Sequence, residues 1–218
     1  MLWVLQSGAQ MTSRYDVGGL AEAQFEPGSR GRVLRNLLGI RRRREMDAFE
    51  AIKLIEATDW AIHNYSADHR FTAADICGLH SRWLGDVYPW AGEHRQVNIG
   101  KGSFAFAMAA QVPRLMNELE SKVLTTHSPC NFQDPERVVT ALADTHCELV
   151  LIHPFRDGNG RLARMLATLM ALQAGLSLLD FSGIKGRRRQ AYFAAVQSSM
   201  SRDYEPMKDV FRAVLRRS

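Results

Sequence analysis

The sequence predicts an all-α domain that carries one short β-hairpin. Apolar residues recur every three or four positions through most of the chain, which is typical of amphipathic helices. A single short segment, 97–106, alternates apolar and polar residues around glycines and predicts the hairpin. With 218 residues, of which 46% are hydrophobic and 23% charged, the chain can form one globular core. We expect an irregular N-terminal arm over residues 1–44 and the folded domain over 45–218.

The first two helices are indicated by different signals. Four apolar residues at helical spacing predict a helix over about 45–63: Ala48, Ile52, Ile55 and Ile62. The next helix has a local start signal, because Thr72 and Asp75 have the spacing of a capping box. That helix is expected to end near Leu84.

The hairpin and the helix after it follow a turn at residues 88–92. Val97 and Ile99 precede a glycine-rich tip, Gly100-Lys101-Gly102-Ser103, and Phe104 and Phe106 follow it. A helix is predicted over about 108–124. Pro113 would lie in its first turn, where a missing N–H costs little.

The C-terminal half predicts four helices. Asp134 and Pro135 form an N-cap and first-residue pair for a helix that reaches about Ile152. A second helix is predicted over about 161–174, with Gly175 at its end. Two more are expected at about 185–200 and 204–216.

Composition narrows the function classes. The net charge of +5 is modest, so the chain does not read as a nucleic-acid-binding protein, and the run at 41–44 is most simply a solvated helix start. Three cysteines without CxxC spacing argue against a disulfide framework or zinc site and favour a reducing, cytoplasmic compartment. No apolar run of about 18 residues or signal peptide is present.

The segment between the two central predicted helices carries the chemistry. Gly158 and Gly160 flank Asn159, so successive N–H groups can converge on an anion at a helix N-terminus. Arg161 and Arg164 are three positions apart and share one face of that helix. Two guanidinium groups beside such a loop suit a polyphosphate.

Two further side chains complete this segment. Asp157 is its one carboxylate and, beside phosphates, would hold Mg²⁺. His153 is its one group able to take a proton near neutral pH. Each residue alone is more often structural, since histidines cap helices and arginines face solvent. Their occurrence together within twelve residues favours a catalytic site.

The segment HPFRDGNGRLAR, residues 153–164, matches the Fic family signature HxFx(D/E)GNGRxxR at every specified position. Residues 87–93 resemble the family's segment before its flap, and 97–106 resemble the flap hairpin. Residues 36–40, NLLGI, resemble the lead-in of Fic toxins that have a separate antitoxin. The similarity spans roughly 30–215 and implies a Fic-type helical domain that transfers AMP from ATP to a protein hydroxyl.

The resemblance also implies roles. His153 would deprotonate the target hydroxyl, and Asp157 would coordinate Mg²⁺. Asn159, with the loop amides, would orient the α-phosphate and stabilise its charge. Arg161 and Arg164 would grip the β- and γ-phosphates, Phe155 would anchor the loop, and the flap around Lys101 would clamp the target.

Two alternatives stay open at this point. The same site could transfer a phosphoryl, UMP or phosphocholine group, although Gly160 favours AMP transfer over the kinase chemistry of Doc-type relatives. The chain could also be a catalytically silent binding module, which the intact His153 argues against. Many Fic enzymes carry an inhibitory (S/T)xxxE(G/N) helix; Ser201 and Glu205 have that spacing, but Pro206 follows. We therefore expect the inhibitory helix on a separate small antitoxin.

Overall fold

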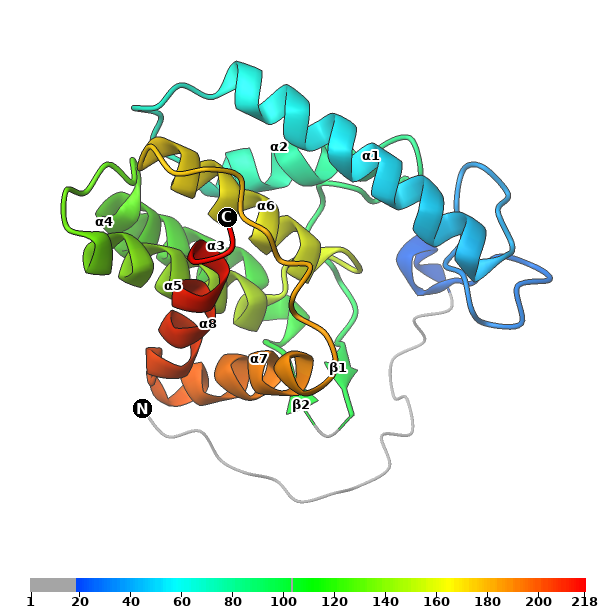
Figure 1. The fold of residues 1–218 in the computed structure, drawn as a ribbon. Helices are drawn as coiled ribbons and strands as arrows, with labels where there is room; N and C mark the ends of the chain where they lie inside the picture. Colours follow the sequence, from blue (N-terminus) through cyan, green and yellow to red (C-terminus); the bar gives the residue numbers. More distant parts are fainter. Residues whose placement is uncertain (1–18, 103) are drawn as a thin grey trace.

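The computed structural model describes residues 19–102 and 104–218. Helices α5 (Pro135–Ile152) and α6 (Asn159–Gln173) form its centre and share the most extensive helix contact (Figure 1). Helices α1 (Arg43–Asn64) and α2 (Ala73–Leu84) pack on α6, whereas α7 (Arg187–Ser198) and α8 (Glu205–Leu215) pack on α5. The predicted all-α fold with one small hairpin is confirmed.

Helix α5 begins and ends at residues whose local chemistry requires it. The Asp134 carboxylate accepts a hydrogen bond from the Glu136 N–H at 3.0 Å, and Pro135 occupies the first helical position. The helix ends at His153, which adopts a left-handed conformation with φ 53°. Pro154 follows, and a proline disfavours the helical conformation in the residue before it. The catalytic histidine candidate is therefore fixed at a helix terminus.

Helix α6 begins two residues before its predicted start. Gly158 precedes it with φ +84°, a left-handed conformation that allows the chain to turn directly into the helix. At the other end Gly175 has φ +74°, as expected of a residue just beyond a helix terminus. The glycines at its two ends thus determine where α6 begins and ends.

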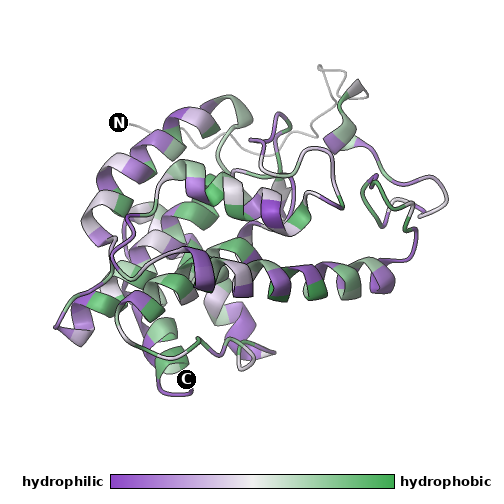
Figure 2. Cartoon of the chain, turned by 90° about the horizontal axis from the view of Figure 1, so that it is seen from above, coloured by the Kyte–Doolittle hydropathy of each residue, from purple (hydrophilic) through white to green (hydrophobic). Residues whose placement is uncertain are grey.

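Helix α1 is present as predicted, but its buried face is a different one. Two of the isoleucines that indicated the helix are exposed, Ile52 by 58% and Ile55 by 71%. The buried side consists of Met46, Glu50, Ala57 and Ala61. Figure 2 shows polar and apolar residues interleaved along α1. The small side chains of Ala57 and Ala61 allow α1 to approach α2 and α6 closely. The face that carries them is therefore buried, and the face that carries Ile52 and Ile55 is exposed.

The capping box of α2 is confirmed. The Thr72 side chain accepts from the Asp75 N–H at 3.1 Å, and the Asp75 carboxylate accepts from the Thr72 N–H at 2.9 Å. The helix predicted over 108–124 is instead divided. A 3-10 turn (Ala109–Gln111) leads into α3 (Val112–Glu118), followed by a π-helical segment (Leu119–Leu124) and α4 (Thr125–His127). Pro113 does lie in the first turn of α3.

The hairpin consists of β1 (Gly100–Lys101) and β2 (Phe104–Ala105), which pair antiparallel. Gly100 lies opposite Ala105, and Lys101 opposite Phe104. The Phe106 N–H extends the ladder to the Ile99 carbonyl at 3.3 Å. Ser103, predicted as part of the tip, lies outside the described residues.

Residues 19–42 of the predicted arm pack against the domain. Phe25 and Leu34 form an isolated antiparallel bridge, and a 3-10 turn spans Ala21–Ala23. The Asn36 side-chain oxygen accepts hydrogen bonds from the N–H groups of Leu38 and Ile40 at 3.2 and 2.9 Å, which shapes the turn into α1. The domain boundary at residue 44 stays a prediction.

Candidate active site

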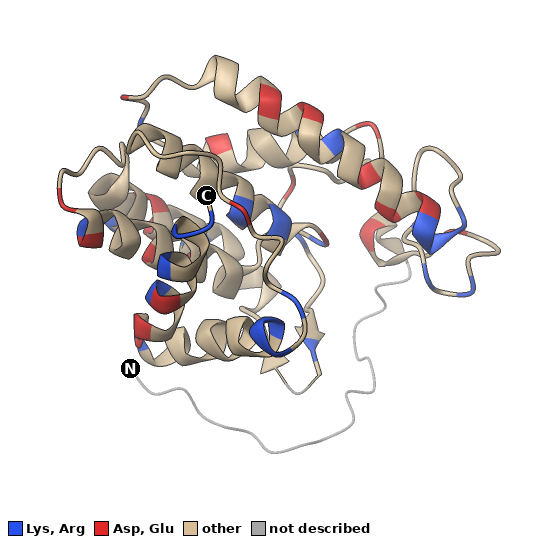
Figure 3. Cartoon of the chain, in the orientation of Figure 1, with Lys and Arg blue, Asp and Glu red and all other residues tan. Residues whose placement is uncertain are grey.

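The predicted signature residues line one large pocket of about 1350 Å³. The 153–158 loop and the start of α6 form one side, the hairpin a second, and α7 a third. Figure 3 shows Lys and Arg on the first half of α6, at the start of α7 and on β1. Seven cationic residues line this pocket: Arg43, Lys101, Arg156, Arg161, Arg164, Lys185 and Arg189. Such a surface favours a ligand with several negative charges.

His153 presents one ring nitrogen to the pocket. Its Nδ1 lies 3.0 Å from the Val150 carbonyl oxygen. Because a carbonyl can only accept, Nδ1 carries the proton and Nε2 keeps a free lone pair. The ring stacks on Phe106 with 3.6 Å between centroids. The end of the hairpin therefore fixes the orientation of a proton acceptor.

The surroundings of His153 keep it neutral. Burial lowers its pKa to about 4, because the ring loses the hydration that stabilises the imidazolium. The nearby charge of Arg95 acts in the same direction. At neutral pH the ring is therefore unprotonated and available as a general base.

Asn159 closes the loop on itself. Its side-chain oxygen accepts from the Phe155 N–H at 2.9 Å, and its side-chain nitrogen donates to the Phe155 carbonyl at 2.7 Å. Phe155 is fully buried and stacks on His80 at 3.9 Å, as expected for the loop anchor. Asn159 thus shapes the loop, while its predicted direct contact with an α-phosphate stays a prediction.

The loop leaves backbone donors at the start of α6. The N–H groups of Asn159 and Gly160 have no hydrogen-bond acceptor among the described residues, and α6 has no side-chain N-cap. The first amides of a helix cannot bond within it, and the helix dipole adds positive potential there. A Cβ at Gly160 would meet only the Arg164 side chain, at 3.8 Å. Asn159 and Gly160 therefore offer free amides at the predicted anion site, whereas the Gly158 N–H is already bonded to Asp157. Binding of an anion there stays a prediction.

The two motif arginines are held differently. Arg161 donates from Nη1 to Glu50 Oε2 at 2.6 Å and lies 4.6 Å above the Trp83 ring centroid. Arg164 lies 5.9 Å from the Phe181 ring centroid. No carboxylate in the described part of the chain forms an ion pair with Arg164. Arg164 is thus unopposed by an internal glutamate within those residues.

The surroundings of Asp157 are compatible with its predicted role as a magnesium ligand. Its Oδ1 accepts from the Gly158 N–H at 2.6 Å and lies 3.6 Å from Arg161 Nη2. Its Oδ2 receives no hydrogen bond from a described residue, and its side chain is 35% exposed in the pocket. Groups of three or more potential metal ligands are absent from the described residues. One carboxylate together with phosphate oxygens is a usual Mg²⁺ environment.

The hairpin reaches across the pocket to α7. The Lys101 ammonium lies 3.6 Å above the Phe193 ring centroid, and Gly102 has φ +62° at the tip. Arg189 approaches the same ring at 5.6 Å. Gly100 and Lys101 therefore line the pocket, and Gly102 lies at the hairpin tip beside them. The predicted role of these residues in target docking stays a prediction.

Sequence inspection missed three polar residues that support the site. Arg95 is 2% exposed and donates to the carbonyls of His153, Val97 and Ala107 at 2.7, 2.7 and 2.5 Å. The Glu22 carboxylate accepts from the N–H groups of Gln96 and Val97 at 2.6 and 3.0 Å. Glu50 is the third. The sequence does carry a signal for Glu50, because this charged residue lies at helical spacing from the apolar residues Met46, Ala57 and Ala61. No comparable pattern indicates that Arg95 or Glu22 is buried.

An apolar wall also escaped prediction. It lines the same pocket and consists of Phe181, Ile184, Tyr192 and Phe193. These residues come from the loop before α7 and from α7 itself. His146 is buried and shares a hydrogen bond of 2.7 Å with the Tyr192 hydroxyl.

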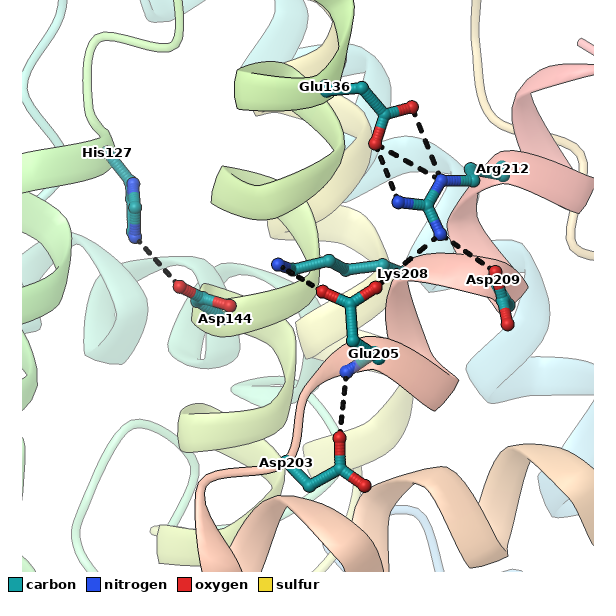
Figure 4. Close-up of polar contacts among 8 residues, drawn as sticks. All are labelled: His127, Glu136, Asp144, Asp203, Glu205, Lys208, Asp209 and Arg212. Carbon is teal, nitrogen blue, oxygen red and sulfur yellow. Dashed lines mark hydrogen bonds and ion pairs between the residues drawn. The ribbon is translucent and has the colours of Figure 1, made fainter.

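Glu205, which with Ser201 has the spacing of an inhibitory element, forms ion pairs on the surface instead. Glu205 begins α8 and pairs with Lys208 at 2.8 Å and Arg212 at 3.7 Å (Figure 4). Arg212 also pairs with Glu136 of α5. The Glu205 carboxylate thus belongs to a surface network that joins α8 to α5.

Comparisons with known proteins agree with this geometry. The sequence profile of the Fic/DOC family matches residues 70–171. The probable protein adenylyltransferase y4lH of Sinorhizobium fredii is 29% identical over 84% of this chain and 91% of its own length. The probable protein adenylyltransferase Fic of Escherichia coli is 27% identical over 84% and 88%. The BepC protein of Bartonella tribocorum, solved with bound AMPPNP, has a TM-score of 0.67 at 23% identity, over 83% of this chain and 91% of that one.

Helical packing around a glycine-rich loop, a partly buried neutral histidine and two arginines that line the same pocket are features of a Fic-type transferase. Residues 70–171 of the chain form a Fic/DOC family domain. Among residues 19–102 and 104–218, the helices lack the combination of length and apolar character that crossing a membrane requires.

Proposed function

We propose that this chain transfers AMP from ATP to the hydroxyl of a serine, threonine or tyrosine side chain on a target protein. The observation that carries the proposal is the 153–164 segment. It brings a neutral histidine, two unpaired helix amides and two arginines to one pocket. Relatives that match most of this chain are named protein adenylyltransferases.

The proposed step is a displacement at the α-phosphorus. Nε2 of His153 takes the proton of the target hydroxyl as its oxygen forms a bond to that phosphorus. The bond from the α-phosphorus to the oxygen that bridges it to the β-phosphate breaks, and pyrophosphate leaves. Chemistry of this type depends chiefly on positioning and charge stabilisation, which the fixed His153 ring and the rigid loop supply.

Charge on the phosphates would be met by residues of α6. The N–H groups of Asn159 and Gly160 would face the α-phosphate, and Arg161 and Arg164 the β- and γ-phosphates. Mg²⁺ held by Asp157 would neutralise phosphate charge and favour loss of pyrophosphate. The apolar wall around Phe193 would receive the base. Three free cysteines suit a reducing cytoplasm as the site of reaction.

The experiment is transfer of label from ATP to protein in a cell lysate. Label on the α-phosphate should appear on a target band, and label on the γ-phosphate should not. Transfer of γ-label only would identify a kinase instead. Absence of both labels from protein, with ATP binding retained, would favour a silent binding module.

We further propose that a separate small protein restrains the chain. Within the described residues Arg164 has no carboxylate partner, and Glu205 pairs with α8 cations. A glutamate brought by an antitoxin with an SxxxE(G/N) helix would pair with Arg164 and exclude the γ-phosphate. Expression of the chain alone should then slow growth, and the partner should restore it. If residues of this chain itself inhibited the transfer, versions truncated at either end would show many-fold higher transfer activity than the full chain.

A further inference from the structure

Glu50 of α1 lies behind the phosphate site and is almost completely removed from water. It is 1% exposed, and it is separated from Arg161 by more than a hundred positions in the sequence. A buried carboxylate is costly unless it is paired and hydrogen-bonded. Its partners therefore show what it does.

Both oxygens of Glu50 are occupied. Oε2 accepts from Arg161 Nη1 at 2.6 Å, and Oε1 accepts from the Tyr88 hydroxyl at 2.7 Å. Burial, with the adjacent Glu50 charge, raises the pKa of Tyr88, so the phenol stays protonated as the donor. The Glu50 carbonyl accepts from Trp83 Nε1 at 2.8 Å. Glu50 is thus fixed from three directions.

The same elements fix the Arg161 guanidinium. Glu50 holds one nitrogen, and the Trp83 ring lies below the group at 4.6 Å from its centroid. Asp157 lies 3.6 Å from the other terminal nitrogen. Arginine has five N–H donors in a rigid plane, so one bond to Glu50 leaves donors free for the pocket that Arg161 lines.

We propose that Glu50 is a positioning residue that orients Arg161 toward the phosphates beyond the α-phosphate. Glu50 acts through Arg161 and touches no substrate. The proposal rests on the proposed function for the identity of the ligand. Arg161 in this orientation distinguishes ADP and ATP from AMP, because only the longer nucleotides carry the phosphates that it meets.

The test is direct binding of Mg·ATP, Mg·ADP and AMP by calorimetry to the full chain and its Glu50→Gln variant. Glutamine keeps the shape and a hydrogen-bond acceptor but removes the charge that orients Arg161. We expect ATP and ADP affinity to fall about 10-fold, the scale of one charge-assisted hydrogen bond, and AMP affinity to stay within about twofold. Glu56→Gln, on the exposed side of the same helix, is the matched control.

A structural role alone would give a different pattern. Equal loss for AMP and ATP, or ATP affinity equal to or tighter than that of the control, would overturn the proposal. So would additive effects of Glu50→Gln and Arg161→Met, because residues that act as a unit are non-additive. If Glu50→Gln does not fold, Glu50→Asp replaces it in the test. Aspartate keeps the charge but, being one methylene shorter, holds it farther from Arg161, and the same nucleotides are compared.

Binding also separates this proposal from the proposed function. If Arg161→Met leaves ATP affinity unchanged, the assignment of the phosphate site is wrong and the role of Glu50 is wrong with it. If ATP binding responds as expected but no AMP is transferred to protein, the proposed function fails while the role of Glu50 stands.

Discussion

Glycine at position 158 is required by two separate features of the loop. Its φ of +84° is a conformation that side chains rarely adopt, and a Cβ there would lie 2.7 Å from Cζ3 of Trp83. Gly175 shares only the first feature, since its φ is +74° and a Cβ there would meet no atom within 4 Å. The two positions therefore form a natural pair for experiment.

Gly158→Ala should destabilise the protein by about 2–3 kcal/mol and reduce ATP affinity, because both strain and a clash displace the loop. Gly175→Ala should cost about 1 kcal/mol and leave ATP affinity unchanged, since it adds only backbone strain. Denaturant unfolding and calorimetry measure the two quantities. Equal effects of both substitutions would show that Trp83 does not limit the loop.

At the residue scale, the sequence predicts site residues that lie within one short segment. It does not predict those whose partners lie far along the chain. His153, Asp157 and Arg161 could be found because they lie within one short segment whose glycines also indicate its conformation. Glu50 and Arg95 could not, because a charged residue in a sequence is equally compatible with exposure. Only the fold shows that both are buried with partners far along the chain.

Among the elements, the hairpin and the end of α5 are joined by Arg95. This buried guanidinium donates to Val97 and Ala107 at the base of the hairpin and to His153 at the end of α5. The Arg95 N–H also donates to the Pro154 carbonyl at 2.8 Å. The hairpin and His153 are therefore positioned by one side chain.

Arg95→Met should lower the rate of transfer more than it weakens ATP binding. Loss of the guanidinium leaves buried carbonyls without donors, which costs about 1–3 kcal/mol each and loosens the hairpin and His153. Faster amide exchange over residues 97–107 would accompany the loss. Arg114→Met, on the exposed face of α3, is the control, and equal exchange in the two variants would contradict the assigned role.

Helix starts could be predicted from local sequence signals, but the buried face of a helix could not. The Thr72–Asp75 box and the Asp134–Pro135 pair placed two helix starts correctly, since capping depends on neighbouring residues. The outward isoleucines of α1 depend on what α2 and α6 present to that helix. The interruption after α3 by a π-helical segment has no sequence signal that we identify.

The whole molecule should be sensitive to acid through two buried histidines, His80 and His146, and the partly buried His153. Burial lowers the pKa of His80 and His153 to about 4 and that of His146 to about 3. In the unfolded chain these side chains titrate near about 6.5. As pH falls from about 6.5 towards 4, the unfolded state binds protons that the folded state does not, so stability is lost in that window.

Each of these histidines should account for about 1–2 kcal/mol of lost unfolding free energy between pH 7 and pH 5. Denaturant unfolding at the two pH values measures this change. His146→Gln should reduce the pH dependence. Stability that is flat or rising as pH falls would show that these rings are not neutral in the folded protein.

The central claim is that His153 removes a proton from a protein hydroxyl during AMP transfer. The most direct measurement compares the purified chain with its His153→Ala variant, using α-labelled ATP and mass spectrometry of the modified proteins. We predict adenylylated serine, threonine or tyrosine with the natural chain, and none with the variant, although both bind Mg·ATP. Equal adenylylation by the variant, or γ-phosphate transfer by the natural chain, would contradict the account.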